Sequence, residues 1–485
     1  MLTASRAERL LPYGLLAAFF CVSILVRPLL PVDETRYLSV AWEMYVRQDF
    51  LVPTMNFAPY FQKPPLLFWL IDLAWGVLGV SRFAAVLVIF AISSLVIDLT
   101  RRLAIALFPD APDIQRRVPW LLLGSVPFVL YSSLILFDLL LTACVLGCLL
   151  ALLAYDRQGR LRFALLAGLL LGLGVLAKGP VILIHLAFPA LLHPLWRQPD
   201  TGLSTRRFLA GFGLAVLVSA AIVAAWLGPA LYSTGRDFAY GLVWEQSAGR
   251  VAGSAHGAHA RPFYFYVLLT PLMLMPWCFF RDLWASRPWL RFRDGNGARS
   301  QDLRILRFLA VWLVGELLVF SAISGKQPHY LLPALPVLVL LLAYFMAGAR
   351  VPTIARTAAA MLGLFAVGQL AASATIFYRY DLSSVAACVA ANSDAELAFA
   401  GRYQGELTFL SRLEKPLTIV EPSAKDEWLQ THPDGYLIAN MRHYPDATRS
   451  VACSQVFRSG HLVVLNGDRA TTLGADTPPD PSAGG

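Results

Sequence analysis

Charged residues are scarce in this 485-residue chain, since Asp, Glu, Lys and Arg together make up only 15% of it. Soluble globular proteins carry about 25%. Hydrophobic residues make up 57% and the mean hydropathy is +0.59, which excludes an ordinary soluble domain. Apolar runs of about 18 or more residues recur, and each is long enough to cross the ~30 Å hydrocarbon core of a bilayer as a helix. The sequence therefore predicts an all-α polytopic membrane protein.

Several functional signals are also missing. The six cysteines form no CxxC or Cys/His ligand spacing, so a zinc site has little support. Nothing resembles a nucleotide-binding loop, and no repeat of the solenoid type is present. The net charge of +9 comes from basic residues in short loops, as the positive-inside rule requires, so it does not indicate a nucleic-acid partner.

Basic residues orient the predicted spans. With Arg6 and Arg9 on the cytoplasmic side, about eleven spans leave roughly half of the 40 Lys and Arg residues in cytoplasmic loops. No small-residue cleavage site follows the first run, so we interpret it as a retained span in preference to a signal peptide. The stretch 66–80 is short and contains Asp72, which favours an interfacial or re-entrant helix. The expected spans lie near 11–30, 82–103, 118–135, 138–155, 162–177, 180–195, 208–231, 263–281, 303–322, 329–347 and 354–377.

We expect three parts in the chain. Residues 1–378 form the membrane module, with the first outer loop at 31–81, and 471–485 form a disordered tail rich in Pro, Gly, Ala and Asp. Between them, 379–470 is predicted to be a small mixed α/β domain outside the membrane, because short β-prone runs alternate with polar turns. Those runs are 407–410, 417–420, 436–440 and 461–466. In this domain Cys388 and Cys453 either pair in an oxidising compartment or remain free.

Unusual polar and aromatic residues collect at the outer ends of the spans and in the outer loops. The positive-inside rule should deplete cations there, yet several occur together with two carboxylates. This combination suits an anionic, membrane-embedded substrate such as a phosphate-linked lipid. The residues are Asp33, Glu34, Arg36, Tyr37, Tyr60, Lys63, Asp138, Lys178, Arg250, His259, Lys326 and Tyr330. We predict that the charged ones meet in one pocket.

Each residue also has a simpler interpretation. Acidic groups such as Asp33 favour a helix N-terminus, and Asp138 also fits an N-cap. A lone lysine at the end of a span usually snorkels to the interface. His185 and Glu316 fall within spans, where charged groups are costly and often functional. One hydrogen-bonded partner across helices would explain each of these two, so we leave both outside the site.

Three segments resemble the GT-C glycosyltransferases, specifically the aminoarabinose transferase and protein O-mannosyltransferase-like superfamily. They are Asp-Glu-Thr-Arg-Tyr at 33–37, Tyr-Phe-Gln-Lys-Pro-Pro at 60–65, and 326–333. The likeness runs from residue 1 to about 350, with Gln62 where the family more often has Glu. It implies a GT-C fold with interfacial helices in the first outer loop. It also implies a donor sugar on polyprenyl phosphate, typically undecaprenyl phosphate in bacteria.

The resemblance also implies roles for individual residues. Asp33 takes the place of the catalytic carboxylate, and Asp138 that of a second acidic residue facing the same cavity. The cations expected near the donor phosphate are Arg36, Lys63, Lys178 and Arg250. Tyr330 matches an aromatic residue near the carboxylates. It is expected to line the substrate cavity, together with other residues collected from their outer-face positions: Glu34, Tyr37, Tyr60, His259 and Lys326. No metal site is expected and no cofactor is required, although the carboxylates are compatible with a divalent cation.

The expected activity is transfer of a sugar from a polyprenyl-phosphate carrier on the periplasmic face of a bacterial inner membrane. The acceptor is a lipid A-like lipid or another envelope molecule, and the displacement inverts the anomeric centre. The short C-terminal part departs from the larger terminal domains of the aminoarabinose enzymes, which leaves the acceptor open. The alternative is a flippase for a lipid-linked saccharide, but transporters place polar groups near the midplane. A non-catalytic scaffold is less favoured, because so many ions face outward.

Overall fold

The computed structural model divides the chain into two compact units. Unit 1 comprises Met1–Leu25 and Phe61–Gly368, and unit 2 comprises Val26–Tyr60 and Gln369–Gly485. The structure describes residues 6–198, 202–234, 241, 261–285, 300–443 and 450–467. The predicted disordered tail, 471–485, lies outside this description. Both units are discontinuous in sequence, and unit 2 joins the beginning of the first outer loop to the C-terminal part of the chain.

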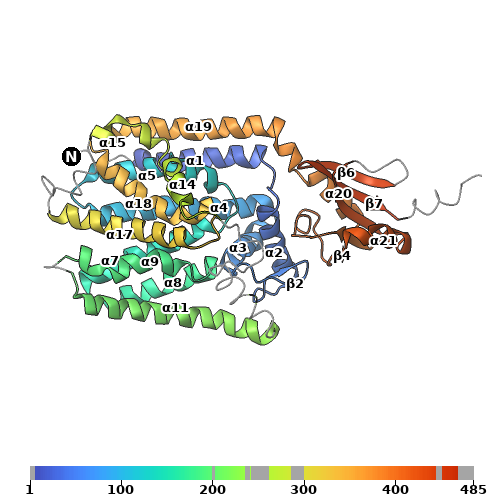
Figure 1. Ribbon diagram of the computed structural model, residues 1–485, viewed down its shortest axis with the longest axis horizontal. Helices are drawn as coiled ribbons and strands as arrows, with labels where there is room; N and C mark the ends of the chain where they lie inside the picture. Colours follow the sequence, from blue (N-terminus) through green and yellow to red (C-terminus); the bar gives the residue numbers. More distant parts are fainter. Residues whose placement is uncertain are drawn as a thin grey trace, which may run out of the picture. The chain divides into compact units, whose positions relative to one another are not determined.

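Within the described residues, eight helices are long and apolar enough to cross a membrane. They are α1 (Arg6–Val26), α4 (Arg82–Leu107), α7 (Asp138–Gln158), α8 (Leu161–Lys178), α11 (Thr205–Thr234), α17 (Ser300–Ala322), η3 (Pro328–Ala334) continued by α18 (Leu335–Phe345), and α19 (Val351–Thr375). Figure 1 shows α7, α8 and α11 running side by side. The prediction of a multi-pass helical membrane protein is confirmed.

The other three expected spans, near 118–135, 180–195 and 263–281, are interrupted helices. Proline lacks a backbone N–H and clashes with the preceding turn, so it ends or breaks a helix. Pro127, Pro194 and Pro276 each stand at or beside such a break. The short helices are α5 (Pro112–Leu123), α6 (Val126–Ser132), α9 (Ile182–Leu191), α10 (His193–Trp196), α14 (Phe265–Met273) and η2 (Trp277–Phe279).

His185 and Glu316, the two ionisable residues within spans that we left outside the site, are partners of one another. His185 of α9 and Glu316 of α17 are both fully buried, and His185 Nδ1 lies 2.7 Å from Glu316 Oε1. The indole nitrogen of Trp312 donates to the same oxygen at 2.6 Å. A hydrogen-bonded partner across helices was predicted for each of them, and this is confirmed. The pair joins two helices of unit 1.

The loop that was predicted to be the first outer loop contains two helices and a small hairpin. Helix α2 (Asp33–Arg47) and the hairpin strands β1 (Thr54–Met55) and β2 (Ala58–Pro59) belong to unit 2. Helix α3 (Leu66–Leu78) belongs to unit 1 and has 13 residues. This is shorter than the roughly 17–25 residues that a membrane span needs. Helices in this loop were predicted, and they are present.

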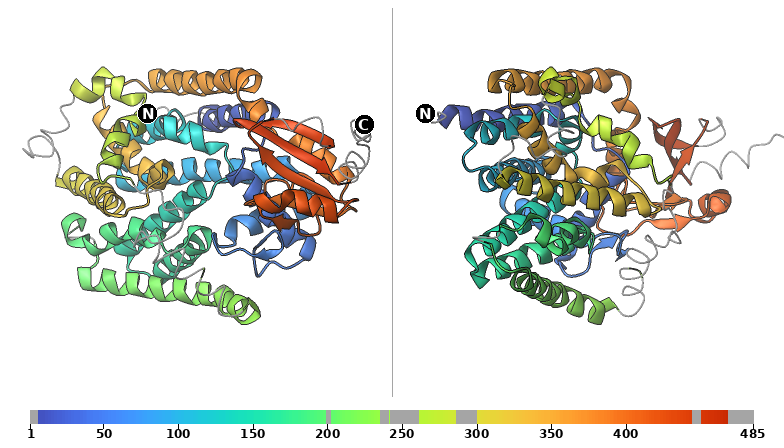
Figure 2. Two further views of the ribbon diagram at one scale, coloured as in Figure 1. Left: turned by 45° about the vertical axis from the view of Figure 1, so that its right-hand side comes forward. Right: turned by 60° about the vertical axis from the view of Figure 1, so that its left-hand side comes forward.

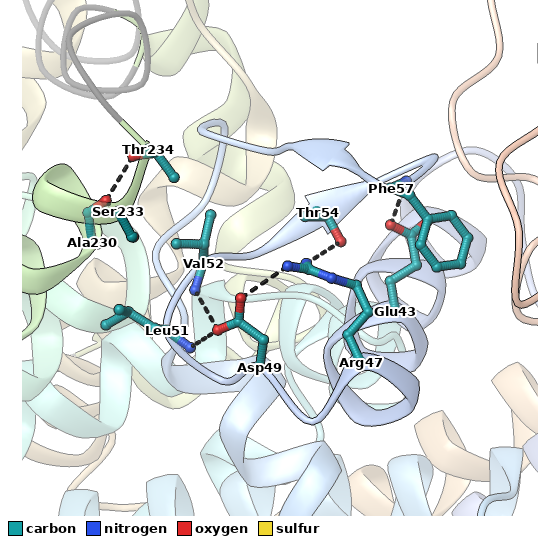
Figure 3. A network of polar contacts seen from close by, with 10 residues as sticks. All are labelled: Glu43, Arg47, Asp49, Leu51, Val52, Thr54, Phe57, Ala230, Ser233 and Thr234. Atoms are coloured by element: carbon teal, nitrogen blue, oxygen red, sulfur yellow. Dashed lines mark hydrogen bonds and ion pairs between the residues drawn. The ribbon is translucent and has the colours of Figure 1, made fainter.

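Glu43, a buried residue of α2, fixes the hairpin to the helix. Its carboxylate accepts hydrogen bonds from the backbone nitrogens of Asn56, at 2.7 Å, and Phe57, at 2.8 Å. Both residues have positive φ, 54° and 60°, as a two-residue hairpin turn of this hand requires. Arg47 of the same helix donates to Thr54 at 3.1 Å (Figure 3). Burial raises the pKa of Glu43 above its ordinary value, against the lowering effect of these hydrogen bonds.

The C-terminal part of unit 2 is a five-stranded mixed sheet with helices on both faces. Its strand order is β4-β3-β5-β7-β6, in which β3 runs parallel to β4 and β5, and β7 runs antiparallel to β5 and β6 (Figure 2). The strands are β3 (Leu397–Ala400), β4 (Thr418–Val420), β5 (Tyr436–Met441), β6 (Val451–Phe457) and β7 (Gly460–Asn466). Helix α20 (Ser383–Ala391) covers one face, and α21 (Lys425–Thr431) the other. The predicted small mixed domain is confirmed.

One of its predicted strands is wrong. Residues 407–410 form turns, and the sheet instead contains β3 and β6, which were not predicted. The backbone nitrogens of Leu407 and Thr408 donate to the hydroxyl of Tyr403, at 3.1 and 2.8 Å. The backbone nitrogen of Phe409 donates to Ser39 Oγ at 3.0 Å. Side-chain oxygens therefore accept the backbone hydrogen bonds that a neighbouring strand would otherwise accept. Hydrophobicity alone does not reveal this arrangement.

Cys388 of α20 and Cys453 of β6 form a disulfide bond. Replacing both with alanine is expected to lower the free energy of unfolding by about 4 kcal/mol, because the bond closes a loop of 65 residues. Thermal unfolding of the purified protein measures this effect. Cys21→Ala is the matched control, because Cys21 is an exposed free cysteine. Equal unfolding temperatures for the double variant and the wild type would contradict the prediction.

Candidate functional site

Asp138 and Lys178 form a buried ion pair at one end of a helical hairpin. Helix α7 begins at Asp138, α8 ends at Lys178, and a tight turn at Gly159 and Arg160 joins them. Because the two helices pack as antiparallel neighbours, their far ends meet, and the Lys178 ammonium donates to Asp138 Oδ1. Their side chains are only 11% and 4% exposed. Buried charges in a membrane protein are costly and usually functional, so this pair is the centre of the candidate site in unit 1.

Aromatic residues of η3 lie beside the pair. The Lys178 ammonium is 4.8 Å from the centroid of the Tyr330 ring. The His329 ring packs edge-on against Tyr330, with centroids 5.0 Å apart, and also approaches Tyr131 of α6 at 6.1 Å. Cations over aromatic faces are attracted by the ring quadrupole. This arrangement holds the Lys178 ammonium from two sides, by a carboxylate and by a ring.

Lys63 is a second cation at this end of α7. Its ammonium lies 5.7 Å from the centroid of Phe137, the residue before Asp138. Lys63 therefore lies at the same end of α7 as Asp138 and Lys178. Two lysines beside one carboxylate leave an excess of positive charge, and such a group favours a phosphate or another anion. The structure thus brings four predicted site residues of unit 1 together: Lys63, Asp138, Lys178 and Tyr330.

Two backbone carbonyl groups hold the side chain of Lys326. Its side chain is buried, and Nζ donates to the carbonyl oxygens of Arg261, at 2.9 Å, and Ile323, at 2.5 Å. The backbone nitrogen of Arg261 in turn donates to Ser324 at 3.1 Å. These contacts give Lys326 a structural role, because they tie the segment that begins at 261 to the end of α17. A part in the substrate cavity stays a prediction.

Three predicted residues share the first turns of α2 in unit 2. The Asp33 side chain is 58% exposed, at the helix N-terminus, where a negative charge is favourable. The Arg36 guanidinium lies 3.9 Å from Asp33 Oδ1, and the Tyr37 hydroxyl is 3.5 Å from the same oxygen. Asp33 is therefore a solvent-accessible carboxylate that two neighbours orient. Such a group can position an acceptor and take its proton.

Glu34 faces the other way, into the protein. Its carboxylate pairs with the guanidinium of Arg27, whose Nη2 lies 3.1 Å from Glu34 Oε1, and it accepts from the backbone nitrogen of Leu30 at 2.9 Å. Both charged side chains are almost fully buried. The pair fixes the bend that leads into α2, and with it the position of Asp33. Tyr60 is also buried, at the end of the hairpin.

Two predicted residues, Arg250 and His259, lie outside the described residues. Arg27 was not among the predicted site residues, although a charged residue at the end of an apolar run is a usable signal. Sequence analysis also passed over His329 and missed Gln404, a partner of Arg36 that lies 368 residues away and leaves no local signal. Among the residues that the structure describes, no group of three or more His, Cys, Asp or Glu side chains is arranged to hold a metal ion.

Family models match two parts of the chain. Residues 62–226 match the dolichyl-phosphate-mannose-protein mannosyltransferases, and 250–389 match the Alg9-like mannosyltransferase family. An undecaprenyl phosphate-alpha-4-amino-4-deoxy-L-arabinose arabinosyl transferase of Sodalis glossinidius is 31% identical over 354 residues, which cover 68% of this chain and 58% of the relative. The enzyme of the same name from Pseudomonas aeruginosa is 27% identical over 69% of this chain and 58% of its own length. The chain therefore matches less than two thirds of these relatives.

Solved structures share the fold. ArnT from Cupriavidus metallidurans bound to undecaprenyl phosphate superposes with a TM-score of 0.78 at 15% identity, covering 97% of this chain and 99% of that one. The archaeal oligosaccharyltransferase AglB from Archaeoglobus fulgidus, in complex with an inhibitory peptide and a dolichol-phosphate, gives a TM-score of 0.56 at 14% identity. It covers 90% of this chain and 70% of AglB. The arrangement of helices and terminal sheet is thus similar to that of ArnT.

Proposed function

Because this chain belongs to the GT-C glycosyltransferases that use polyprenyl-phosphate sugars, the family of the aminoarabinose and protein-mannosyl transferases, we propose that it transfers a sugar from a polyprenyl-phosphate carrier to a lipid A-like acceptor. The matched relatives are undecaprenyl phosphate-aminoarabinose transferases by name. Undecaprenyl phosphate is accordingly the proposed carrier, and 4-amino-4-deoxy-L-arabinose is the first sugar to test.

The observation that carries this proposal is the buried pair of Asp138 and Lys178. Burying two charges is costly, because desolvation costs several kcal/mol per ion. Together with Lys63 and the Tyr330 ring, the pair forms a fixed cationic group that suits a phosphate. Fixed cations stabilise the charge that develops on a departing phosphate, because they need no reorganisation at the moment of reaction.

The proposed reaction is a single displacement at the anomeric carbon. An acceptor oxygen forms the new bond to this carbon as the bond to the carrier phosphate breaks, and polyprenyl phosphate leaves with the electron pair. Inversion follows, because no covalent intermediate forms. If the acceptor is a hydroxyl, Asp33 takes its proton; if it is a phosphate, Asp33 only positions it. Lys63 and Lys178 meet the charge on the leaving phosphate, and Arg36 and Arg250 keep the phosphate-binding role that the sequence predicts for them. No cofactor is needed for this chemistry.

The proposed location of the reaction is the periplasmic face of a bacterial inner membrane. The disulfide between Cys388 and Cys453 supports this, because such bonds form and persist in oxidising compartments. The basic residues Arg157, Arg160 and Arg162 support it as well, since they lie at the opposite end of the α7–α8 hairpin from Asp138 and Lys178. By the positive-inside rule, this basic turn is cytoplasmic and the ion pair faces outward.

A transfer assay with the purified protein in vesicles tests the function. Labelled undecaprenyl phosphate-aminoarabinose is supplied together with lipid A, and the label is expected to appear in lipid A. Vesicles that contain heat-denatured protein provide the control. If the label crosses the bilayer but no new glycolipid forms, the protein is a flippase and the proposal fails. A product with a different labelled sugar or envelope acceptor would keep the activity and change the substrate.

A further inference from the structure

A turn of the C-terminal domain packs directly on α2, the helix that carries Asp33. We refer to residues 403–409 as the docking turn. Ser39, a fully buried residue of α2, donates to the carbonyl oxygen of Gly405 at 2.7 Å and accepts from the backbone nitrogen of Phe409 at 3.0 Å. Trp42, one turn further along α2, donates to the carbonyl oxygen of Leu413 at 2.8 Å. Both elements lie within unit 2.

Gly405 allows this close contact. It has a φ of +77°, and a Cβ atom there would lie 3.2 Å from Ser39 Cβ and 3.3 Å from the Cα atom of Arg36. A side chain would therefore meet the backbone of α2, in a conformation that is itself strained for residues other than glycine. Hydrogen bonds within the docking turn also hold it in place, because the Tyr403 hydroxyl accepts from the backbone nitrogens of Leu407 and Thr408.

The docking turn also contacts Arg36, one of the cations predicted to bind the donor phosphate. The Arg36 guanidinium donates to Gln404 Oε1, and the same guanidinium lies 3.9 Å from Asp33. The backbone nitrogen of Gln404 donates to the Glu406 carboxylate at 2.7 Å. Burial raises the pKa of Glu406, whereas this hydrogen bond and the charge of Arg36 lower it. The hydrogen bond to Glu406 thus fixes the backbone of Gln404, while the Gln404 side chain accepts a hydrogen bond from Arg36.

We propose that Gln404 is a positioning residue, which holds the Arg36 guanidinium beside Asp33 so that it meets the donor phosphate. The C-terminal domain would then take part in the catalytic machinery, since its docking turn supplies this contact to α2. A neutral amide suits this task, because it accepts a hydrogen bond without cancelling the charge that a phosphate requires. This inference rests on the proposed function.

Gln404→Met tests the inference, because it removes the hydrogen-bond acceptor at nearly constant volume. A hydrogen bond to a charged group contributes enough that its loss should lower kcat/KM for the donor about 10-fold. KM for the acceptor should not change. The matched control is Gln430→Met, since Gln430 is an exposed residue of α21 in the same domain. Binding of undecaprenyl phosphate itself should weaken by a similar factor in Gln404→Met only.

A double-mutant cycle separates positioning from a merely structural role. If Gln404 acts through Arg36, then Gln404→Met should have no further effect in an Arg36→Ala background. Multiplicative losses in the double variant, or unchanged donor kinetics and binding in Gln404→Met, would overturn the inference. Gly405→Ala provides a second variant, in which hydrogen exchange in residues 33–47 should accelerate as the docking turn is displaced. Unchanged exchange there would also overturn it.

The proposed function and the proposed role of Gln404 can be contradicted independently of one another. A wild-type protein that binds undecaprenyl phosphate but makes no product contradicts the transferase, and the binding measurement with Gln404→Met still decides the role of Gln404. A wild-type protein that neither binds the carrier lipid nor transfers from it contradicts both. Gln404→Glu adds a direct check on charge, because it keeps the contact with Arg36 but should weaken binding of the phosphate.

Discussion

With a hydroxyl acceptor, Asp33→Asn is expected to reduce sugar transfer by about 10²–10⁴-fold, the range that a positioned general base contributes. The asparagine keeps the size of the side chain but cannot take a proton from a hydroxyl acceptor. Folding should be unaffected, because the Asp33 side chain is 58% exposed and its separation of 3.9 Å from Arg36 is that of a weak surface pair. Transfer rates at matched protein levels, together with the unfolding temperature, measure both effects.

Asp394→Asn serves as the control for this experiment. Asp394 is exposed in the same unit, lies just before the sheet, and takes no part in the proposed chemistry. The control should retain wild-type transfer. Turnover close to that of the wild type in Asp33→Asn would remove Asp33 from the mechanism. A large loss of thermal stability would instead show that the carboxylate has a structural function.

Lys178→Met is expected to destabilise the protein by about 3–5 kcal/mol and to abolish transfer. The change leaves the Asp138 carboxylate buried without the ammonium that it pairs with, and an uncompensated buried charge is strongly destabilising. Transfer is lost as well, because the cation also serves the leaving phosphate. Thermal unfolding in detergent reports the first effect, and the transfer assay reports the second.

A second substitution distinguishes the two effects. The double variant Lys178→Met with Asp138→Asn has no charge left to compensate, so it should recover most of the lost stability. It should remain inactive, because the cation is still absent. Lys178→Arg should keep both the pair and the stability. A single Lys178→Met variant as stable as the wild type would contradict the buried pair.

The membrane part of the fold was predictable because hydropathy and charge act locally along the chain. Eight of the expected spans are continuous helices, and the stretch at 66–80 is the short helix α3. Prolines decided where the other three expected spans break, and their positions were visible in the sequence. The small sheet was predicted as a domain, but its strands were not all placed correctly. Residues 407–410 are apolar enough for a strand, yet their amides bond to Tyr403 and Ser39.

The candidate site was predictable to a lesser extent. Topology placed Asp138 and Lys178 on the same side of the membrane, and the structure pairs them directly. The sequence also marked His185 and Glu316 as needing partners, and each is the partner of the other. The residue type and position of Glu34 suited a site residue, but its side chain contacts Arg27 and Leu30. The direction in which a side chain points depends on helix rotation, which residue type does not determine.

The sequence by itself determined that this chain is a multi-pass membrane protein with a small terminal domain. Those properties follow from the free energy of transferring each segment into lipid, which is nearly additive over neighbouring residues. Only the tertiary structure decided that Gln404 contacts Arg36 and that Gly405 lies against α2. These contacts join residues more than 360 positions apart. They depend on how two packed surfaces fit together, and no local pattern in either segment encodes that fit.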